Sequence, residues 1–396
     1  MNKTVMALAV AGALAAPAAA LAQVQIGGSI HVQMFQHDPG NQSSEKKTDI
    51  FETTEPNIVI SAEEKLAGGL SAFMTCESSF DVGGSAIDGF CGRNSGVGFK
   101  SGGMGSIFFG NWDTPHKMAV SPMRGWFGLN NVFARATILW NTAPSNVGNG
   151  FNSLDDGAQS TANAAGFSRR QRETLNWHGP NWGGFSLQAQ YSGGNDGTNL
   201  TSASPLSPRM TSLGARFGTG PLIITAGYEE HKDFNPTGLA TGAYAGGTDD
   251  SWVIGAAYTF FGALKVSGVY TENNYELGNA ANATLKSKGY ALWLDWTIAG
   301  PHSVKAQYVV QDSPSGTAGA VVNTYAVAAA GAAQGDRGAE VVTLVYSYAF
   351  SKRTSLYGAY NQLKNDANTA AYGLGQTNTT VGGTQKAFGI GMRHSF

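Results

Sequence analysis

The feature of this sequence that most limits its possible folds is a period-two alternation of apolar residues with polar or small ones. It runs through four stretches: residues 252–260, 290–298, 342–350 and 388–396. Such alternation predicts β-strands that have one apolar face and one wet face. In the second stretch Asp295 lies on the face opposite Leu294 and Trp296, and a charge on a lipid-facing surface would be costly. We therefore interpret the Asp295 face as the inside of a barrel.

Membrane-spanning helices are excluded by the same sequence. No uncharged apolar run after residue 22 comes close to the ~18 residues that such a helix needs. A membrane protein without these helices must be a closed barrel, because open sheet edges leave backbone polar groups unpaired in hydrocarbon. With glycine at 54 of 396 residues, charged residues at 13% and aromatics at 11%, the composition suits tight turns and aromatic girdles. A secreted β-sandwich would share this composition.

The N-terminus is typical of a secretory signal peptide. Lys3 precedes an uncharged stretch, residues 6–22, that ends in the small-x-small sequence Ala20-Leu21-Ala22. We predict that residues 1–22 are removed and that residues 23–396 form one barrel domain. A membrane anchor is the alternative, although the stretch is short for a helical span. The formal net charge is −2, and −3 once Lys3 is lost, so we expect no nucleic-acid partner.

Short turns and long polar segments alternate along the rest of the chain. Tight turns carrying Gly, Asn or Pro are predicted at seven places: 66–69, 101–105, 179–184, 218–221, 260–263, 299–301 and 350–353. Eight longer segments lie between them, near 36–56, 80–92, 112–168, 194–209, 232–249, 276–284, 313–338 and 365–384. This rhythm is typical of outer-membrane barrels. Seven turns and eight loops join sixteen antiparallel strands, and the first strand, about 24–34, is expected to pair with the last, about 385–396.

The strand count bears on function. Sixteen strands enclose a water-filled channel, whereas about eight leave a core filled by side chains. Merging two weak strands between Asn94 and Asn111 would leave fourteen strands as the alternative. Aromatic residues recur beside the short turns, as expected for interfacial girdles: Trp177, Trp182, Phe185, Phe260, Phe261, Trp296, Tyr348 and Phe350.

The segment from residue 112 to residue 168 is the first candidate for function. It exceeds fifty residues without a convincing alternating strand, and structureless loops beyond ~12–15 residues are uncommon unless they are functional. We predict that it folds into the barrel and narrows it, so that its charges set the ion selectivity. The candidate constriction residues on it are Asp113, Lys117, Arg124 and Arg135. The alternative is that this segment only covers the outer rim.

Arginines on the facing wall are the second set of candidates. On the strand near 170–177, Leu175 and Trp177 suit lipid, so alternation turns Arg170 and Arg172 inward. Arg93 is expected to face the lumen by the same reasoning. Together with the loop charges these arginines predict a weakly anion-selective constriction. Contacts with lipopolysaccharide phosphates, or stabilising ion pairs, are the alternative roles.

Cys76 and Cys91 are the only cysteines. In the oxidising compartment that a signal peptide implies, a disulfide that closes an external loop is favoured. Metal binding is the alternative, but no histidine lies at ligand spacing from either cysteine. The sequence holds no nucleophile elbow, phosphate-binding loop or metal-spaced cluster. We therefore expect neither an enzyme nor a cofactor.

Several motifs resemble the general porins of Gram-negative β-proteobacteria, which are related to the neisserial porins. The matching stretches are 351–357 (SKRTSLY) and 389–396 (GIGMRHSF), with weaker matches at 63–70, 108–115 and 176–185. The resemblance covers the whole mature chain weakly. It implies a homotrimer of sixteen-stranded barrels in the outer membrane, each with its third loop folded into the pore.

The resemblance also implies a ladder of lumen arginines that faces the inserted loop and favours anions. By position Arg93 and Arg170 match that ladder, whereas Asn57 and Asn111 stand where the family often has arginine. An acidic stretch that is frequent in the family's third loop is replaced here by residues 122–126 (PMRGW), so that an arginine takes the place of the acid. These two departures act on the selectivity in opposite directions.

Phe396 resembles the terminal aromatic by which the barrel-assembly machinery recognises its clients, and an aromatic there would anchor the closing strand at the membrane interface. The sequence as a whole predicts a passive diffusion porin for inorganic ions and small hydrophilic solutes, embedded in outer-membrane lipid and lipopolysaccharide. Two alternatives remain. One is a substrate-specific channel, for which Trp293 in the lumen is the hint, and the other is a non-conducting structural or adhesive barrel.

Overall fold

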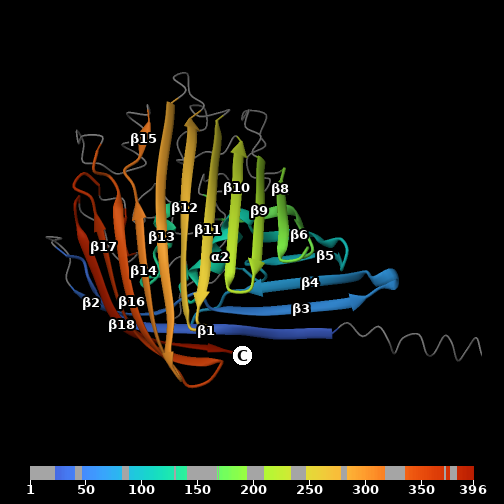
Figure 1. Cartoon of the computed structure of the whole chain (residues 1–396), viewed down its shortest axis with the longest axis horizontal. Coiled ribbons are helices and arrows are strands. Elements are labelled where there is room, and N and C mark those ends of the chain that lie inside the picture. Colours follow the sequence, from blue (N-terminus) through green and yellow to red (C-terminus); the bar gives the residue numbers. More distant parts are fainter. Residues whose placement is uncertain are drawn as a thin grey trace, which may run out of the picture.

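The computed structural model describes residues 23–40, 47–82, 89–128, 131–140, 167, 169–193, 209–232, 247–277, 283–316, 335–369, 372–374 and 381–396. The expected signal peptide, residues 1–22, lies outside this part of the chain, and its removal stays a prediction. Eighteen strand segments join into one sheet, which forms a tall curved wall in Figure 1. No helix in the described ranges is long and apolar enough to cross a membrane.

The elements follow one another in a simple order. The strand segments are β1 (Gln23–Asp38), β2 (Thr48–Thr53), β3 (Asn57–Lys65), β4 (Ser71–Ser78), β5 (Ser95–Ser101), β6 (Gly105–Asp113), β7 (Arg170–His178), β8 (Phe185–Ser192), β9 (Arg209–Thr219), β10 (Leu222–Lys232), β11 (Thr248–Phe260), β12 (Leu264–Leu277), β13 (Ala283–Ala299), β14 (His302–Gln311), β15 (Ser315–Gly316), β16 (Ala339–Ala349), β17 (Thr354–Asn365) and β18 (Thr384–Ser395). The described helices are α2 (Pro115–Arg124) and the short 3-10 helices η2 (Ala67–Gly69) and η3 (Ala136–Leu139).

The sheet closes on itself because β1 pairs antiparallel with the last strand as well as with its neighbours in sequence. Ile30 lies opposite His394 of β18. β2 and β3 both pair with β1 and form one wall strand that is interrupted at residues 54–56, and β15 continues β14 in its pairing with β13. The eighteen segments therefore make sixteen wall strands, as predicted. The fourteen-strand alternative is wrong, because β5 and β6 are separate strands that pair with each other.

The two faces of the wall differ as the alternation predicts. Apolar side chains on the outer face are exposed, for example Leu292 at 52% and Phe388 at 66%, whereas their inward neighbours Ala291 and Ala387 are buried. Asp295 lies on the inner face, where it accepts a hydrogen bond from Lys305 Nζ (2.5 Å). An apolar outer face and a polar inner face suit a barrel that has lipid outside and water inside.

All seven predicted turns join consecutive strands. The eight longer segments alternate with these turns along the chain, but the first, predicted at 36–56, contains the end of β1 and all of β2, so the prediction of a loop there is wrong in part. Aromatic side chains beside the turns point outward and are exposed, among them Trp296 at 44% and Phe350 at 63%. Phe261, in the turn between β11 and β12, is 97% exposed. This is the placement that an aromatic girdle at a membrane interface requires.

Candidate pore constriction

The third loop (residues 114–169) begins with α2, which packs on the inner face of the wall. Proline is favoured in the first helical turn, and Pro115 occupies it, while the Thr114 side chain accepts a hydrogen bond from the backbone N–H of Lys117 (3.3 Å). The helix ends at Gly125, whose φ of 58° is readily adopted by glycine. α2 contacts β8 to β12, and Figure 1 shows it behind these strands.

The inner wall is shaped to receive this helix. A Cβ atom on Gly227 of β10 would lie 3.2 Å from the Cβ of Ala119, which is tighter than ordinary contact. Wall hydroxyls also bind the helix backbone. Thr225 Oγ1 donates to the carbonyl of Ala119 (2.7 Å), and Ser267 Oγ donates to the carbonyl of Met123 (2.6 Å). The start of the third loop is therefore fixed to the β10–β12 side of the lumen.

Residues 131–140 of the loop span the lumen between β12 and β17. Asn273 Nδ2 of β12 donates to the carbonyl of Leu139 (2.8 Å), and Asn361 Nδ2 of β17 donates to the carbonyl of Val132. Both asparagines are fully buried on the inner face. Only a segment inside the closed wall can reach both, so this part of the loop lies in the lumen and does not merely cover the rim.

Charged side chains from the ends of β4 to β7 and from α2 form one network of ion pairs and hydrogen bonds. Asp113 Oδ1 lies 3.1 Å from Lys117 Nζ and 3.1 Å from Arg170 Nε. Asn94 Nδ2 donates to Asp113 Oδ2 (3.1 Å), and the backbone N–H of Asn94 donates to Glu77 Oε2 (3.3 Å). Arg93 Nε in turn pairs with Glu77 Oε1 (2.9 Å). The charged network, as we use the term below, consists of Glu77, Arg93, Asn94, Asp113, Lys117 and Arg170.

The members of the charged network differ in their access to water. The side chains of Lys117 and Arg170 are 4% and 1% exposed, whereas those of Asp113 and Arg93 are 20% and 17% exposed. His116, beside Lys117 on α2, adds no charge at neutral pH, because burial lowers its pKa to about 4. Three cations and two carboxylates leave the charged network with one excess positive charge.

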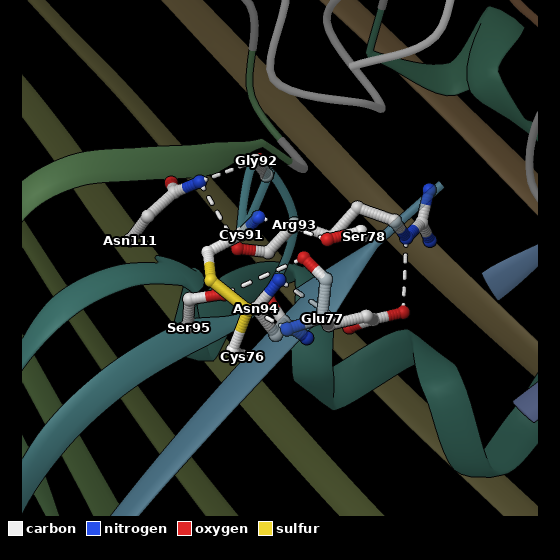
Figure 2. The surroundings of a disulfide bond; sticks show 9 residues. All are labelled: Cys76, Glu77, Ser78, Cys91, Gly92, Arg93, Asn94, Ser95 and Asn111. Carbon is white, nitrogen blue, oxygen red and sulfur yellow. Dashed lines mark hydrogen bonds and ion pairs between the residues drawn. A yellow bond between two sulfur atoms is a disulfide. The ribbon is translucent and has the colours of Figure 1, made fainter. Parts of the chain in front are cut away.

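A disulfide joins Cys76 to Cys91 at the base of the second loop, as predicted, with the two Cα atoms 4.7 Å apart (Figure 2). Glu77 directly follows one cysteine, and Arg93 lies two residues after the other. The backbone N–H of Arg93 donates to the carbonyl of Glu77 (3.0 Å), and Asn111 Nδ2 donates to the carbonyl of Arg93 (3.1 Å). The disulfide removes both thiols from metal binding, and the described residues contain no His, Cys, Asp and Glu group that fits a metal ion.

Two of the predicted constriction residues on the third loop lie outside the charged network. Arg124, the last residue of α2, donates from Nη1 to the carbonyl of Phe127 (3.3 Å). Arg135 is only 5% exposed, and its Nε donates to the carbonyl of Gly373 in the eighth loop (3.0 Å). Arg135 is therefore enclosed between two loops. The prediction that it faces open water in the constriction is wrong.

Arg172 also lies outside the charged network, and the expectation that it faces inward beside Arg170 does not hold. The pairing of β6 with β7 shifts register between Gly110 and Trp112, which leaves an extra residue in β7. Gln171 is the residue turned inward there, where its Nε2 donates to Ser192 Oγ (3.3 Å), and Arg172 is exposed. A bulge of this kind breaks the strict alternation from which the expectation was derived.

Sequence reasoning missed the neutral and acidic partners of these arginines. Asn57 stands where the family often has arginine, and it connects β1 to β4. Its Oδ1 accepts a hydrogen bond from the backbone N–H of Ser29 (2.9 Å), and its Nδ2 donates one to Glu77 Oε1 (2.9 Å). Glu77 could have been found from alternation along β4, which turns it to the same face as Phe73 and Thr75. No local signal identifies Asn94, because it lies in the loop before β5.

The chain was compared with known proteins. A family model described as Gram-negative porin matches residues 7–368. The chain is 28% identical over 232 residues to outer membrane porin protein 32 of Delftia acidovorans, a match that spans 57% of each chain. It is 24% identical over 336 residues to an outer membrane porin protein of Bordetella pertussis, spanning 79% of each. Its fold is similar to that of an anion-selective porin from Comamonas acidovorans, with a TM-score of 0.67, 20% identity, and coverage of 95% of this chain and 100% of that one.

Proposed function

Because this chain belongs to the Gram-negative porin family and is thus an outer-membrane channel protein rather than an enzyme, we propose that its charged network forms the constriction of a passive diffusion pore. Inorganic ions and small hydrophilic solutes cross the outer membrane through the sixteen-strand barrel. The observation that carries the proposal is that Asp113 joins Lys117 of the third loop to Arg170 of the wall. Loop and wall thus meet at one charged site inside the lumen.

We infer a weak preference of this pore for anions. The charged network has one excess positive charge, and a low-dielectric wall around a constriction strengthens the effect of such a charge on passing ions. The carboxylates of Glu77 and Asp113 offset most of the cationic charge, so the preference is smaller than for a ladder of arginines without acids. The fold relative from Comamonas acidovorans is described as anion-selective, which supports the sign of the preference.

Planar-bilayer recording of the purified protein under a salt gradient tests this assignment. Arg93→Ala and Arg170→Ala each remove a cation and leave a carboxylate behind, so the reversal potential should move toward the value for cation preference. Arg124→Ala should have a smaller effect, since Arg124 bonds only to the carbonyl of Phe127 among the described residues. Lys352→Ala, in the turn between β16 and β17, is the matched control and should leave the potential unchanged.

The recordings distinguish a failure of the channel function from a failure to locate the constriction. A wild-type protein without channel activity would refute the proposal of a diffusion pore altogether. Unchanged reversal potentials in both the Arg93→Ala and the Arg170→Ala variant would end the assignment of the constriction to the charged network and leave the barrel intact.

The family resemblance implies a homotrimer, and the second loop supports that assembly in this chain. Val82 and Phe90 lie on the described flanks of this loop and are 52% and 81% exposed. Large apolar side chains that protrude from an external loop suit burial by a protein partner better than contact with water. We infer that the second loop packs against a neighbouring subunit, with its base held by the Cys76–Cys91 disulfide.

The alternative of a substrate-specific channel has no support at Trp293. This tryptophan points inward, but it is only 3% exposed and its Nε1 donates to Gln307 Oε1 (2.8 Å). A ring enclosed in this way cannot serve as a stacking surface for a passing solute.

A further inference from the structure

We propose that the turn between β16 and β17 binds the headgroup of an anionic phospholipid, such as phosphatidylglycerol, in the periplasmic leaflet of the outer membrane. Lys352 and Arg353 in this turn hold the lipid phosphate, and exposed aromatic side chains beside the turn contact the rest of the lipid. The site goes beyond the channel function proposed above, because it lies outside the lumen. It also gives a role to the motif 351–357, which the pore itself does not use.

This turn differs in charge from the other six short turns. Lys352 and Arg353 are adjacent and exposed, and neither side chain forms an ion pair or a hydrogen bond with another residue in the described part of the chain. The other six turns contain no Asp, Glu, Lys or Arg at all: 66–69, 101–105, 179–184, 218–221, 260–263 and 299–301. An arginine can bind a phosphate through two parallel hydrogen bonds, and a lysine adds a point charge. The two cations are thus free to bind an external anion.

The neighbouring strand ends contain no acidic side chain that could neutralise these cations. Residues 344–349, 354–360 and 389–395 include no Asp or Glu, and Arg393 adds a further positive charge. Asp295 on the next strands lies on the inner face, where it pairs with Lys305 Nζ (2.5 Å). The end of the barrel around this turn therefore carries a net positive charge, which attracts anionic headgroups more than zwitterionic ones.

Aromatic side chains on the outer face lie directly beside the cations. Phe350, which begins the turn, is 63% exposed, and its ring centroid lies 5.0 Å from that of Tyr348. Tyr348 contacts the ring of His302 in β14 (5.2 Å), and His302 Nδ1 lies 2.6 Å from the Tyr346 hydroxyl oxygen. Amphipathic rings of this kind favour the membrane interface. They present apolar surface to the acyl chains and polar edges to the glycerol region of a lipid.

The depth of the cations in the membrane selects a lipid over a soluble polymer as the ligand. The short turns of such barrels lie on the periplasmic side, and the Phe350 ring marks the membrane interface there. At ~3.3 Å per residue, and allowing for the reversal of the chain, Lys352 and Arg353 extend about 7 Å beyond this ring. That distance is about the thickness of one headgroup layer. The two cations therefore lie at the level of the lipid phosphates.

The turn is also held in a fixed conformation before any ligand binds. Ser351 Oγ accepts hydrogen bonds from the backbone N–H groups of Arg353 (3.1 Å) and Thr354 (3.1 Å). The backbone N–H of Phe350 donates to the carbonyl of Thr354 (2.9 Å), and that of Ser395 in β18 donates to the carbonyl of Arg353 (2.9 Å). Figure 1 shows the turn at the foot of the wall, near the C-terminus. Such preorganisation lowers the entropic cost of binding.

Titration of the folded protein with phosphatidylglycerol, followed by native mass spectrometry, tests the proposal. The wild type should bind this lipid more tightly than zwitterionic phosphatidylcholine. The double variant Lys352→Ala with Arg353→Ala should raise the Kd for phosphatidylglycerol about thirtyfold, whereas Lys352→Arg with Arg353→Lys should keep the wild-type Kd. Lys65→Ala is the matched control, because this exposed lysine beside the first turn is already paired with Glu63 (2.5 Å).

Further arms of the experiment identify the source of the phosphate. Glycerol 3-phosphate should not compete with phosphatidylglycerol, and Phe350→Ala should weaken binding of the lipid, because the aromatic contacts require a lipid ligand. An unchanged Kd in the double alanine variant would overturn the proposal, as would equal affinity of the wild type for the two lipids. Binding to purified peptidoglycan that depends on Lys352 and Arg353, without any effect on lipid binding, would assign the turn to a periplasmic polymer and would also overturn it.

The channel function and the lipid site can fail separately. The double alanine variant should migrate as a folded protein on semi-native gels and keep the wild-type conductance, because its substitutions lie outside the lumen. A wild-type protein that binds phosphatidylglycerol but conducts no current would refute the diffusion pore and leave the lipid site in place.

Discussion

Asn94 links the two carboxylates of the charged network, Glu77 and Asp113, although it carries no charge. Its Oδ1 accepts from the backbone N–H of Asp113 (2.9 Å) and from Arg170 Nε (2.9 Å), while its backbone N–H donates to Glu77. An amide can donate and accept at once, so it can stand between two carboxylates that would otherwise repel each other. Inspection of the sequence for charges finds the arginines but overlooks such a neutral residue.

Phe90 is the residue on which the trimer can be tested most directly. Because it is 81% exposed, Phe90→Asp removes almost no contact within the subunit. If the neighbouring subunit buries this ring, the change should weaken each contact by about 2 kcal/mol, the scale of burying one large apolar side chain. The melting temperature of the trimer, read on semi-native gels, should then fall.

Phe261→Asp provides the matched control for that substitution. Phe261 is even more exposed, at 97%, but lies in the turn between β11 and β12, at the opposite end of the barrel from the second loop. Trimers of the Phe90 variant that dissociate at the wild-type temperature would contradict a role of the second loop in assembly.

At the scale of elements, the strands were predictable and the irregularities in them were not. Alternation and turn residues are local features, so they determined all sixteen wall strands and their connections. The bulge between β6 and β7 depends on how two strands far apart in sequence pair. It turns Gln171 inward and leaves Arg172 exposed. The interruption between β2 and β3 at Glu55, whose φ is 46°, likewise depends on tertiary pairing, because both segments pair with β1.

The second loop should owe much of its order to its disulfide. The bond closes a sequence separation of 15 residues, for which the restriction of the unfolded loop is worth about 3 kcal/mol. The double variant Cys76→Ser with Cys91→Ser should therefore be cut faster within residues 79–94 by a protease than the wild type. The melting temperature of the barrel should change little, because the sheet pairing does not depend on this bond.

Treatment with a reductant separates this effect from a change in folding. Reduction should accelerate cleavage of the wild type and leave the double variant unaffected. Equal cleavage rates for the oxidised wild type and the double variant would mean that the disulfide does not order the loop.

At the scale of the whole molecule, closure of the barrel depends on the last residue as well as on β18. The backbone N–H of Phe396 donates to the carbonyl of Gly28 (3.0 Å), and that of Gly28 donates to the carbonyl of Phe396 (3.2 Å). The Phe396 ring is 48% exposed on the outer face, where an interfacial aromatic would anchor the closing strand. We propose that Phe396 is the assembly signal that the family resemblance implies.

Deletion of Phe396 should reduce the yield of trimers in the outer membrane far more than the conductance of each channel that forms. Quantitative blotting of membrane trimers, combined with single-channel recording, measures both effects. Phe388→Ala, which removes another exposed aromatic of β18 without shortening the strand, is the control. A normal trimer yield after the deletion would refute the role of Phe396 in assembly.

The sequence by itself determined the barrel, its sixteen strands, the positions of its turns and the pairing of the two cysteines. These follow from period-two alternation, from glycine, asparagine and proline at turns, and from the presence of only two cysteines, all of which act locally or leave one choice. Only the tertiary structure decided which charges meet. Arg93, Asp113, Lys117 and Arg170 come together through Asn94, whereas Arg135 is enclosed against the eighth loop, because both contacts join segments that only closure of the wall and inward folding of the loops bring into reach.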